Sequence, residues 1–475
     1  METKPLRIFR EISKIPRGSG NEKGISDWCA EYARDRGFEA VQDSALNVII
    51  KVPGTEGYEN KPPVILQGHM DMVCEKNADK AHDFSKDPIT LVERGDMIYA
   101  DGTTLGADNG VAVAMCMALL DESAPHPPLE ILLTVDEEQG MVGVIDLDPA
   151  TLTGRRLINL DSEEEGYLCT SCAGGRRVTL KLSGKREKMQ IARTCVIKVR
   201  GLRGGHSGAQ IDQGLANSAR VLARVLLSVV KEHGARVAHI SGGLKNNAIP
   251  RESEAVVFMP PENYSAAEKT VKNFEKIIKA EYRVIDPGVT VSIEQIKSGG
   301  TPFDKVTSWK IPALILLSPD GVLGMSADIK GLVETSNNLG VVQTDGDAVS
   351  FSYALRSSVH SKKDELVTAL KLIGHTLGAE YIESSDYPAW AYAPNSPLRD
   401  SLAASYEDIY GAKPQFTAIH AGLECGILGK KLNDCDMVSL GPNLYDVHSP
   451  DEHMSVSSLN RTYEFLLKAL ANLSD

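Results

Sequence analysis

Polar side chains that could bind a metal follow an apolar run near the start of this chain. The segment VILQGHMDMV, residues 64–73, is typical of a buried strand, yet it ends in His69 and Asp71. Side chains alternate along an extended chain, so residues two apart project to the same side. His69 could therefore ligate a metal through one ring nitrogen while Asp71 accepts a hydrogen bond from the other. Taken alone, this spacing fits a turn histidine with a capping aspartate better.

Further acids stand at comparable places. Asp108, in LGADNGVAVA, precedes an expected helix and by itself is typical of a helix cap. Three acids, DEE at 136–138, follow the apolar run LEILLTV, where like charges are unfavourable unless a cation neutralises them or one takes up a proton. Asp161 directly follows RLINL, whereas the glutamates after it fit a solvated turn.

Two late histidines, His448 and His453 in LYDVHSPDEHMS, could complete a site or lie on the surface. Histidines and carboxylates at strand ends of one sheet form a mixed nitrogen and oxygen ligand set, suited to zinc, manganese or cobalt. A set of five exceeds what one catalytic zinc with an open position needs, but it serves two metals if one carboxylate bridges. The five candidates are His69, Asp108, Glu138, Asp161 and His448.

A pair of metals about 3.5–4 Å apart would generate a bound hydroxide near neutral pH and clamp the oxygens of a tetrahedral intermediate. One carboxylate must stay free to take the proton from water and pass it to the leaving amine. The adjacent Glu137 and Glu138 allow one to ligate and the other to act as general base, and spacing alone does not say which.

These residues need a sheet that brings strand ends together. Near-continuous apolar runs at 64–68, 129–135 and 156–160, with a helical pattern at 109–122 between the first two, predict an α/β catalytic domain with a largely parallel central sheet. Ligands gather at the carboxyl ends of the strands in such sheets. Helical spacing also predicts two helices before the first strands, at about 5–15 and about 21–37.

A second domain is predicted inside the first. After the charged stretch SGKREKMQ at 183–190, strands and long helices alternate, and the order repeats from the apolar runs 311–318 and 347–358. We expect an inserted α+β lid domain of two similar lobes over residues 189–384, with the catalytic domain formed by 1–188 and 385–475. A chain of 475 residues is long enough for two cores.

Composition narrows the partners. The net charge is −13, from 64 acidic and 51 basic side chains without a basic block, which argues against nucleic acid. The sequence has no export signal and no run of ~18 apolar residues, so we expect no membrane association. The 8 cysteines are too sparse for a disulfide scaffold and fit reduced thiols in a cytoplasm.

The motifs GHMD, GADNG, DEE, NLDSE and DVHSPDE, in this order, resemble the co-catalytic zinc metallopeptidase family of carnosinases and aminoacylases. The resemblance spans nearly the whole chain and is closest to the branch of bacterial aminoacyl-histidine dipeptidases, also called Xaa-His or beta-alanyl-histidine dipeptidases. It implies a di-metal hydrolase whose inserted lid covers the metals. The metals would be two divalent ions, zinc first, with cobalt or manganese as alternatives.

The resemblance also implies roles for individual residues. Asp108 would bridge the metals, Asp71 would orient a ligand from behind, and Glu137 would be the general base. The family's five metal ligands match His69, Asp108, Glu138, Asp161 and His448.

Residues of the lid and of the late segment match substrate-binding positions. His206, in VRGLRGGHSG, would stabilise the oxyanion, although its glycines also fit a flexible loop. Asn247, in LKNNAIP, would be a polar contact, and a turn is the alternative. Arg356 lies in an apolar strand pattern and should meet a carboxylate, either a structural one or a peptide's carboxyl terminus. Glu424, in HAGLECG, would meet the substrate's ammonium group or be a buried structural acid.

We therefore predict a cytoplasmic metallodipeptidase for small dipeptides, of Xaa-His type including beta-alanyl-histidine. An N-acyl amino acid amidohydrolase of the same clan would share every metal ligand and differ in the pocket for the amino side. A metal-stabilised binding protein without catalysis would not need Glu137. A homodimer is compatible with the sequence.

Overall fold

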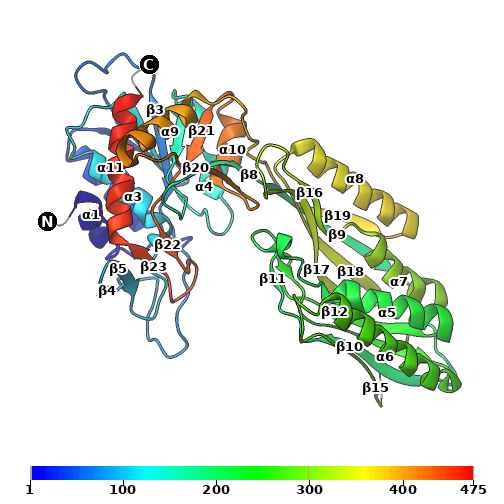
Figure 1. Ribbon diagram of the computed structural model, residues 1–475. Coiled ribbons are helices and arrows are strands. Elements are labelled where there is room, and N and C mark those ends of the chain that lie inside the picture. The colour runs from blue at the N-terminus through cyan, green and yellow to red at the C-terminus, as the bar shows by residue number, and fades with distance from the viewer. Residues whose placement is uncertain (1–2, 298, 474–475) are drawn as a thin grey trace. The chain divides into compact units, whose positions relative to one another are not determined.

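The computed structural model describes residues 3–297 and 299–473 (Figure 1). The chain divides into unit 1, Met1–Ser171 with Trp390–Ala418 and Leu423–Asp475, and unit 2, Cys172–Ala389 with Ile419–Gly422. The first crossing therefore precedes the charged stretch at 183–190. This stretch lies within unit 2 because the strand before it, β9 (Gly174–Ser183), pairs with β18 (Ala348–Ser357) of that unit.

Unit 1 is built on an eight-stranded sheet of order β1-β2-β6-β3-β7-β21-β8-β20. Its central strands β6, β3, β7 and β21 run parallel, which confirms the predicted α/β class. The strands are β1 (Glu39–Gln42), β2 (Val48–Val52), β3 (Val64–His69), β6 (Leu129–Thr134), β7 (Arg156–Asn159), β8 (Tyr167–Cys172), β20 (Gln415–Ile419) and β21 (Asp436–Ser439).

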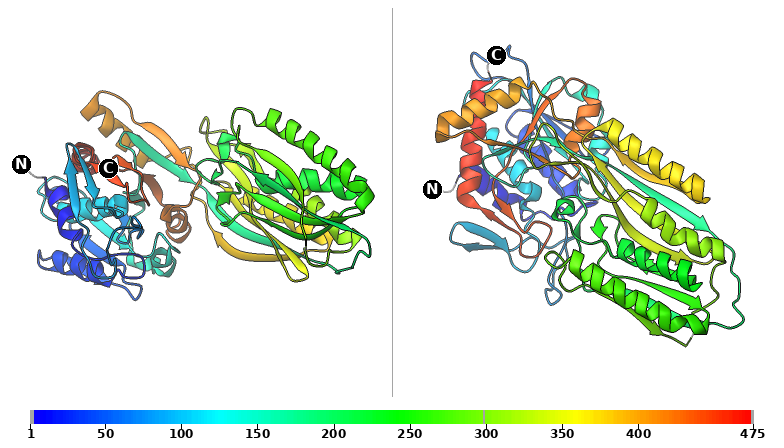
Figure 2. Two further views of the ribbon diagram at one scale, coloured as in Figure 1. Left: turned by 90° about the horizontal axis from the view of Figure 1, so that it is seen from below. Right: turned by 45° about the vertical axis from the view of Figure 1, so that its right-hand side comes forward.

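Burial explains these strands. Every residue of β3 and β6 is buried, as expected for parallel strands covered on both faces. Helix α3 (Ala107–Leu119) packs on β3, and all its residues except Asp108 are buried, because a helix that is apolar on all sides belongs in a core. The amino-terminal α1 (Lys4–Ile12) packs on both α3 and the carboxyl-terminal α11 (Val456–Asn472) (Figures 1 and 2). The remaining helices of unit 1 are α2 (Lys23–Arg34), α4 (Val142–Asp146), α9 (Pro397–Tyr410) and α10 (Glu424–Lys431).

A small sheet of order β22-β23-β5-β4 also belongs to unit 1. Its strand β23 (His453–Ser455) places the ring of His453 between Tyr99 and Tyr445, at centroid distances of 4.5 and 4.9 Å. His453, which the sequence offered beside His448, thus packs in an aromatic stack. The other strands are β4 (Leu91–Arg94), β5 (Met97–Ala100) and β22 (Leu444–Tyr445).

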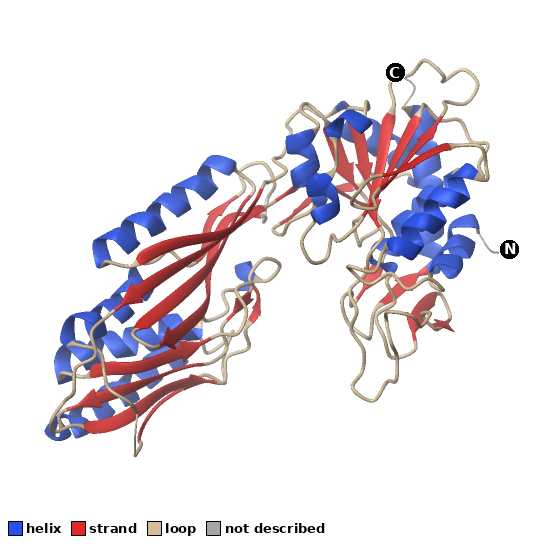
Figure 3. Cartoon of the chain, turned by 180° about the vertical axis from the view of Figure 1, so that it is seen from behind, coloured by secondary structure: helices blue, strands red, loops and turns tan. Residues whose placement is uncertain are grey.

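Unit 2 contains an antiparallel sheet of order β15-β10-β14-β12-β17-β18-β9-β19, with β16 beside β17. Helices lie along one face of it (Figure 3). The pair β12–β17 joins two groups of strands, in line with the predicted two-lobed α+β insert. Its further elements are β10 (Arg193–Arg200), β11 (Gly205–His206), β12 (Arg236–Gly242), β13 (Ala248–Ile249), β14 (Ser253–Met259), β15 (Thr290–Gln295), β16 (Gly321–Met325), β17 (Val333–Asp345), β19 (Glu380–Tyr387), α5 (Ser218–His233), α6 (Tyr264–Glu281), α7 (Lys305–Leu317) and α8 (His360–Leu377).

One predicted strand of unit 2 is wrong. Residues 311–317 form the second half of α7, with Pro312 inside the helix, and Ser318 follows its end. A short apolar run does not distinguish a buried strand from a buried helix, and here the buried Ile311, Leu314 and Ile315 face the core from a helix. Among the described residues, no helix has the length and apolar character needed to cross a membrane.

A glycine in β3 allows α3 to approach the sheet. A Cβ on Gly68 would lie 2.4 Å from Cβ of Ala112 and 2.5 Å from Oδ1 of Asn109. The Asn109 side chain joins two strand ends, because its oxygen accepts from the backbone N–H of His69 and its nitrogen donates to the carbonyl of Leu160.

We expect Gly68→Ala to lower the free energy of unfolding by about 1–3 kcal/mol through overpacking. Urea unfolding measures this. Gly24→Ala in α2 is the matched control, because its Cβ would meet the nearest atom at an ordinary 3.4 Å. Wild-type stability of Gly68→Ala would show that α3 can move away from β3 freely.

Candidate metal centre

Two histidines face the two oxygens of one carboxylate. Nε2 of His69 lies 3.2 Å from Oδ1 of Asp108, and Nε2 of His448 lies 3.0 Å from Oδ2 of the same residue. Each oxygen is thus shared with a different imidazole, which is the arrangement that a carboxylate bridging two cations requires.

One further carboxylate completes each half of the cluster. Oδ1 of Asp161 lies 3.4 Å from Nε2 of His69, and Oε1 of Glu138 lies 2.9 Å from Nε2 of His448. The ligand atoms of His69, Asp108 and Asp161 lie within 4.8 Å of one another, and so do those of Asp108, Glu138 and His448. The structure therefore brings all five predicted ligands together in two groups that share Asp108.

The parallel sheet explains how distant residues meet. His69 ends β3, while Glu138 and Asp161 follow β6 and β7, the two parallel neighbours of β3. Asp108 comes from the first turn of α3, where the peptide bond to Asn109 is cis. His448 lies between β22 and β23 with φ +62°, a left-handed conformation that is unfavourable for a residue with a Cβ.

Asp71 supports this cluster from behind. Its Oδ1 lies 3.2 Å from Nδ1 of His69, and its carboxylate accepts hydrogen bonds from the backbone N–H groups of Glu137 and Glu138 and from the hydroxyl of Ser19. Burial would raise the pKa of Asp71, but the hydrogen bonds from His69, Ser19 and the backbone lower it to about 2. One ionised side chain thus orients a histidine and the loop that carries both glutamates.

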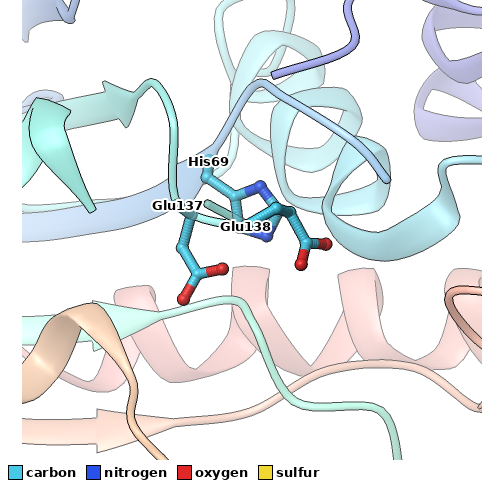
Figure 4. A group of neighbouring side chains, drawn as sticks. All are labelled: His69, Glu137 and Glu138. Atoms are coloured by element: carbon cyan, nitrogen blue, oxygen red, sulfur yellow. The ribbon is translucent and has the colours of Figure 1, made fainter. Parts of the chain in front are cut away.

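The two glutamates point apart beside His69 (Figure 4). Glu138 contacts His448. Among the histidines of the described residues, only His69 has a ring nitrogen close enough to Glu137 to share a metal with it. Burial raises the pKa of Glu137 well above its ordinary value, and the neighbouring carboxylates of Asp161, Glu424 and Glu138 add to this effect.

The donor set fits two divalent cations. Burial raises the pKa of Asp161 to about 7, and the negative charges of Asp108 and Glu138 contribute. Carboxylates packed this closely repel one another unless cations lie between them. Two imidazoles and three carboxylates suit zinc, cobalt or manganese.

Glu424 lies beneath this cluster rather than on a surface. It is 0% exposed, and its Oε2 accepts hydrogen bonds from the Gln67 amide and, at 2.7 Å, from the Thr134 hydroxyl. Burial raises the pKa of Glu424 to about 7. This environment favours the buried structural acid over a contact with a substrate ammonium group.

His206 and Asn247 are neighbours in unit 2. Strands β11 and β13 pair His206 with Ala248, and the Asn247 carbonyl accepts from the backbone N–H of Ser207. Nδ1 of His206 accepts from the N–H groups of Gly208 and Ala209, so its proton is held on Nε2. Burial and the nearby charge of Arg356 lower the pKa of His206, which keeps the imidazole neutral.

Arg356 is a buried cation of unit 2 without an acidic partner among the described residues. It is 8% exposed, and its Nη1 donates to the Tyr387 hydroxyl at 3.2 Å. Its buried Nε has no hydrogen-bond partner among the described residues. Sequence reasoning missed the neighbouring His420, whose Nε2 lies 2.7 Å from Oγ of Ser336. A lone histidine with no other polar residue at a regular spacing carries no signal in the sequence.

An α/β unit with this shared-carboxylate cluster, and a buried glutamate beside it, has the architecture of a metal-dependent hydrolase. The model of peptidase family M20/M25/M40 matches residues 65–472, and the chain belongs to this family of metal-dependent peptidases. The family resemblance of the sequence motifs is thereby confirmed.

Relatives cover the chain almost completely. The chain is 36% identical to the cytosol non-specific dipeptidase of Escherichia coli over 98% of its length and 96% of that protein. It matches the crystal structure of aminoacylhistidine dipeptidase from Vibrio alginolyticus with a TM-score of 0.91 and 35% identity, over 98% and 96% of the two chains. The aminopeptidase PepT of Bacillus cereus shares the fold, with a TM-score of 0.58 and 16% identity over 99% and 98%.

Because His420 is buried, we expect the folding stability of unit 2 to fall at acid pH. Burial and the charge of Arg356 lower the pKa of His420 to about 4, against ~6.5 in an unfolded chain. The unfolded state therefore binds the proton more tightly, and stability is lost as pH falls from ~6.5 toward ~4, by about 3 kcal/mol in full.

We expect His420→Gln to lose about 2–3 kcal/mol less stability than the wild type between about pH 7 and about pH 4, measured by urea unfolding. His360→Gln is the control, because that side chain is 70% exposed. Equal acid sensitivity of His420→Gln and wild type would contradict the assignment.

Proposed function

We propose that this protein is a cytoplasmic dipeptidase that hydrolyses Xaa-His dipeptides, including beta-alanyl-histidine, with two zinc ions. The observation that carries the proposal is that the two carboxylate oxygens of Asp108 face His69 and His448. The named activities of the Escherichia coli and Vibrio alginolyticus relatives support dipeptides as substrates, and the first relative's name supports the cytosol.

The ligands divide into two sets in this proposal. His69, Asp161 and Oδ1 of Asp108 would hold one metal, and His448, Glu138 and Oδ2 of Asp108 the other. Bound metals would lower the pKa of water and polarise the scissile carbonyl.

Glu137 moves the proton. Burial raises the pKa of its carboxyl group, so Glu137 is a stronger base toward the attacking water than an exposed glutamate would be. It then donates that proton to the nitrogen of the leaving amine. Asp71 helps to place Glu137, because it accepts from the Glu137 backbone N–H at 3.1 Å.

Residues of unit 2 recognise the substrate. Because Nδ1 of His206 is already an acceptor, its Nε2–H is free to donate a hydrogen bond to the oxyanion that forms at the carbonyl. Arg356, a buried guanidinium without a described acidic partner, would pair with the peptide carboxylate. Asn247 would be a further polar contact beside His206.

Glu137→Gln should lower kcat by about 100–10,000-fold, because the amide cannot take the proton. Metal analysis should still find about two equivalents per chain, and removal of metal with a chelator should abolish wild-type activity. Glu164→Gln, in the exposed turn after Asp161, is the control and should behave like wild type. Unchanged turnover by Glu137→Gln would refute its role, and loss of metal would make Glu137 a ligand instead.

A substrate panel separates the proposal from its alternatives. Dipeptides with a carboxyl-terminal histidine should be hydrolysed faster than their carboxamides, whose neutral ends cannot pair with Arg356, and faster than N-acyl amino acids. Arg356→Gln should reduce kcat/KM for dipeptides at least about tenfold. It should also reduce the ratio of kcat/KM between a dipeptide and its carboxamide. Dominant turnover of N-acyl amino acids would favour the amidohydrolase, and metal binding without any turnover would favour the non-catalytic binding protein.

A further inference from the structure

Arg17 is a buried cation of unit 1 that binds neither a metal nor a substrate in the proposal above. Its side chain is 2% exposed. Nη1 donates to the carbonyls of Met70 and Asp71 at 2.9 and 3.3 Å, and Nη2 donates to the carbonyl of Gly106. The guanidinium therefore connects the segment that follows His69 with the loop that precedes Asp108.

Glu452 binds the same loop, but through the backbone N–H groups of the loop instead of its carbonyls. The side chain is 2% exposed and belongs to the segment that carries His448, between β22 and β23. Its Oε2 accepts from the N–H groups of Leu105 and Gly106 at 2.8 and 3.1 Å, and its Oε1 from those of Ala107 and Asp108 at 2.7 and 3.4 Å.

The glycines of GADNG make room for Arg17. A Cβ on Gly106 would lie 2.6 Å from Nη2 of Arg17, and one on Gly110 would lie 2.5 Å from the same atom. Gly106 also has φ +70°, which disfavours a side chain there. The guanidinium thus fills a space that these two positions leave open.

The buried charges compensate one another. Burial lowers the pKa of Arg17, and the carboxylates of Glu452, Asp71 and Asp108 oppose that effect. Buried ions are unfavourable without hydrogen bonds and opposite charges, so apolar side chains would fill this space at a smaller desolvation penalty. What the ions add is the orientation of named backbone groups.

We propose that Glu452, assisted by Arg17, is a positioning residue for the metal centre. The two side chains join the segments that carry His69, Asp108 and His448, and they turn the Asp108 oxygens toward both histidines before metal binds. The inference rests on the metal ligands of the proposed function, but its test measures metal binding and does not depend on turnover.

The test is Glu452→Gln, titrated with Co²⁺ and with Zn²⁺ by calorimetry. The amide can replace only one of the two accepting oxygens, so part of the loop loses its acceptor. We expect metal affinity to fall by about 10–100-fold, as for other residues that orient ligands, and the Co²⁺ absorption spectrum to change. Arg17→Lys keeps the charge but loses the forked donor geometry, and it should weaken Co²⁺ binding as well.

Glu130→Gln is the matched control. Glu130 is also buried, at 3% exposure, and its carboxylate accepts from the N–H groups of Thr153 and Gly154. It lies near the start of β6, while the metal ligands follow the other end of that strand. We expect Glu130→Gln to lower the melting temperature without changing metal affinity or the Co²⁺ spectrum.

The outcomes are distinct. Wild-type affinity and spectrum in Glu452→Gln would overturn the positioning role, and so would an equal loss of affinity in Glu130→Gln, since general destabilisation would then explain both. If Glu452→Gln does not fold, Glu452→Asp keeps the charge with a shorter reach, and normal metal affinity in that variant would overturn the role. A wild-type protein that binds two metals but cleaves no dipeptide would refute the proposed function and leave this inference standing.

Discussion

The sharing of Asp108 between two imidazoles is the constraint on which unit 1 depends. A carboxylate can face two histidines only if its backbone is held between them, and His69 and His448 come from opposite ends of the chain. The parallel strands bring His69, Glu138 and Asp161 to one edge of the sheet, and α3 brings Asp108 to that edge from above a glycine of β3. The contacts of Asp71, Arg17 and Glu452 then fix the orientation of the ligand side chains.

Several features of the metal centre lower the stability of the folded protein. Burial and the charges of Asp108 and Glu138 raise the pKa of Asp161, His448 adopts an unfavourable backbone conformation, and Arg17 and Glu452 are buried ions. Such features are retained where chemistry needs them and are compensated elsewhere. Here the compensation is visible as hydrogen bonds to backbone groups, which Asp71 accepts from two residues and Glu452 from four.

The sequence could predict the parts of the site that follow from strand pattern. An acid or a histidine after an apolar run pointed to His69, to the pair Glu137 and Glu138, and to Asp161. The family resemblance then chose Glu138 as the ligand and related Asp108 and His448 to the set. Arg17, Glu452 and His420 were not predicted, because they act through backbone groups or a single serine, and such partners leave no spacing in a sequence. The prediction for the run 311–318 is wrong for a different reason, because its apolar residues fit either a strand or a helix. The crossing between units could not be placed from composition, because the polar stretch at 183–190 merely connects two strands of unit 2.

The place of His448 in the chain has a consequence for biosynthesis. Four of the five proposed ligands are complete by residue 161, but the last one, and the strand β21 that pairs with β7, come after all of unit 2. A ribosome making this protein therefore exposes a half-built acidic cluster while all of unit 2 is still to be translated. The second metal position proposed above could not close until residue 448 has been made, so full metal loading would have to wait for the synthesis of unit 2.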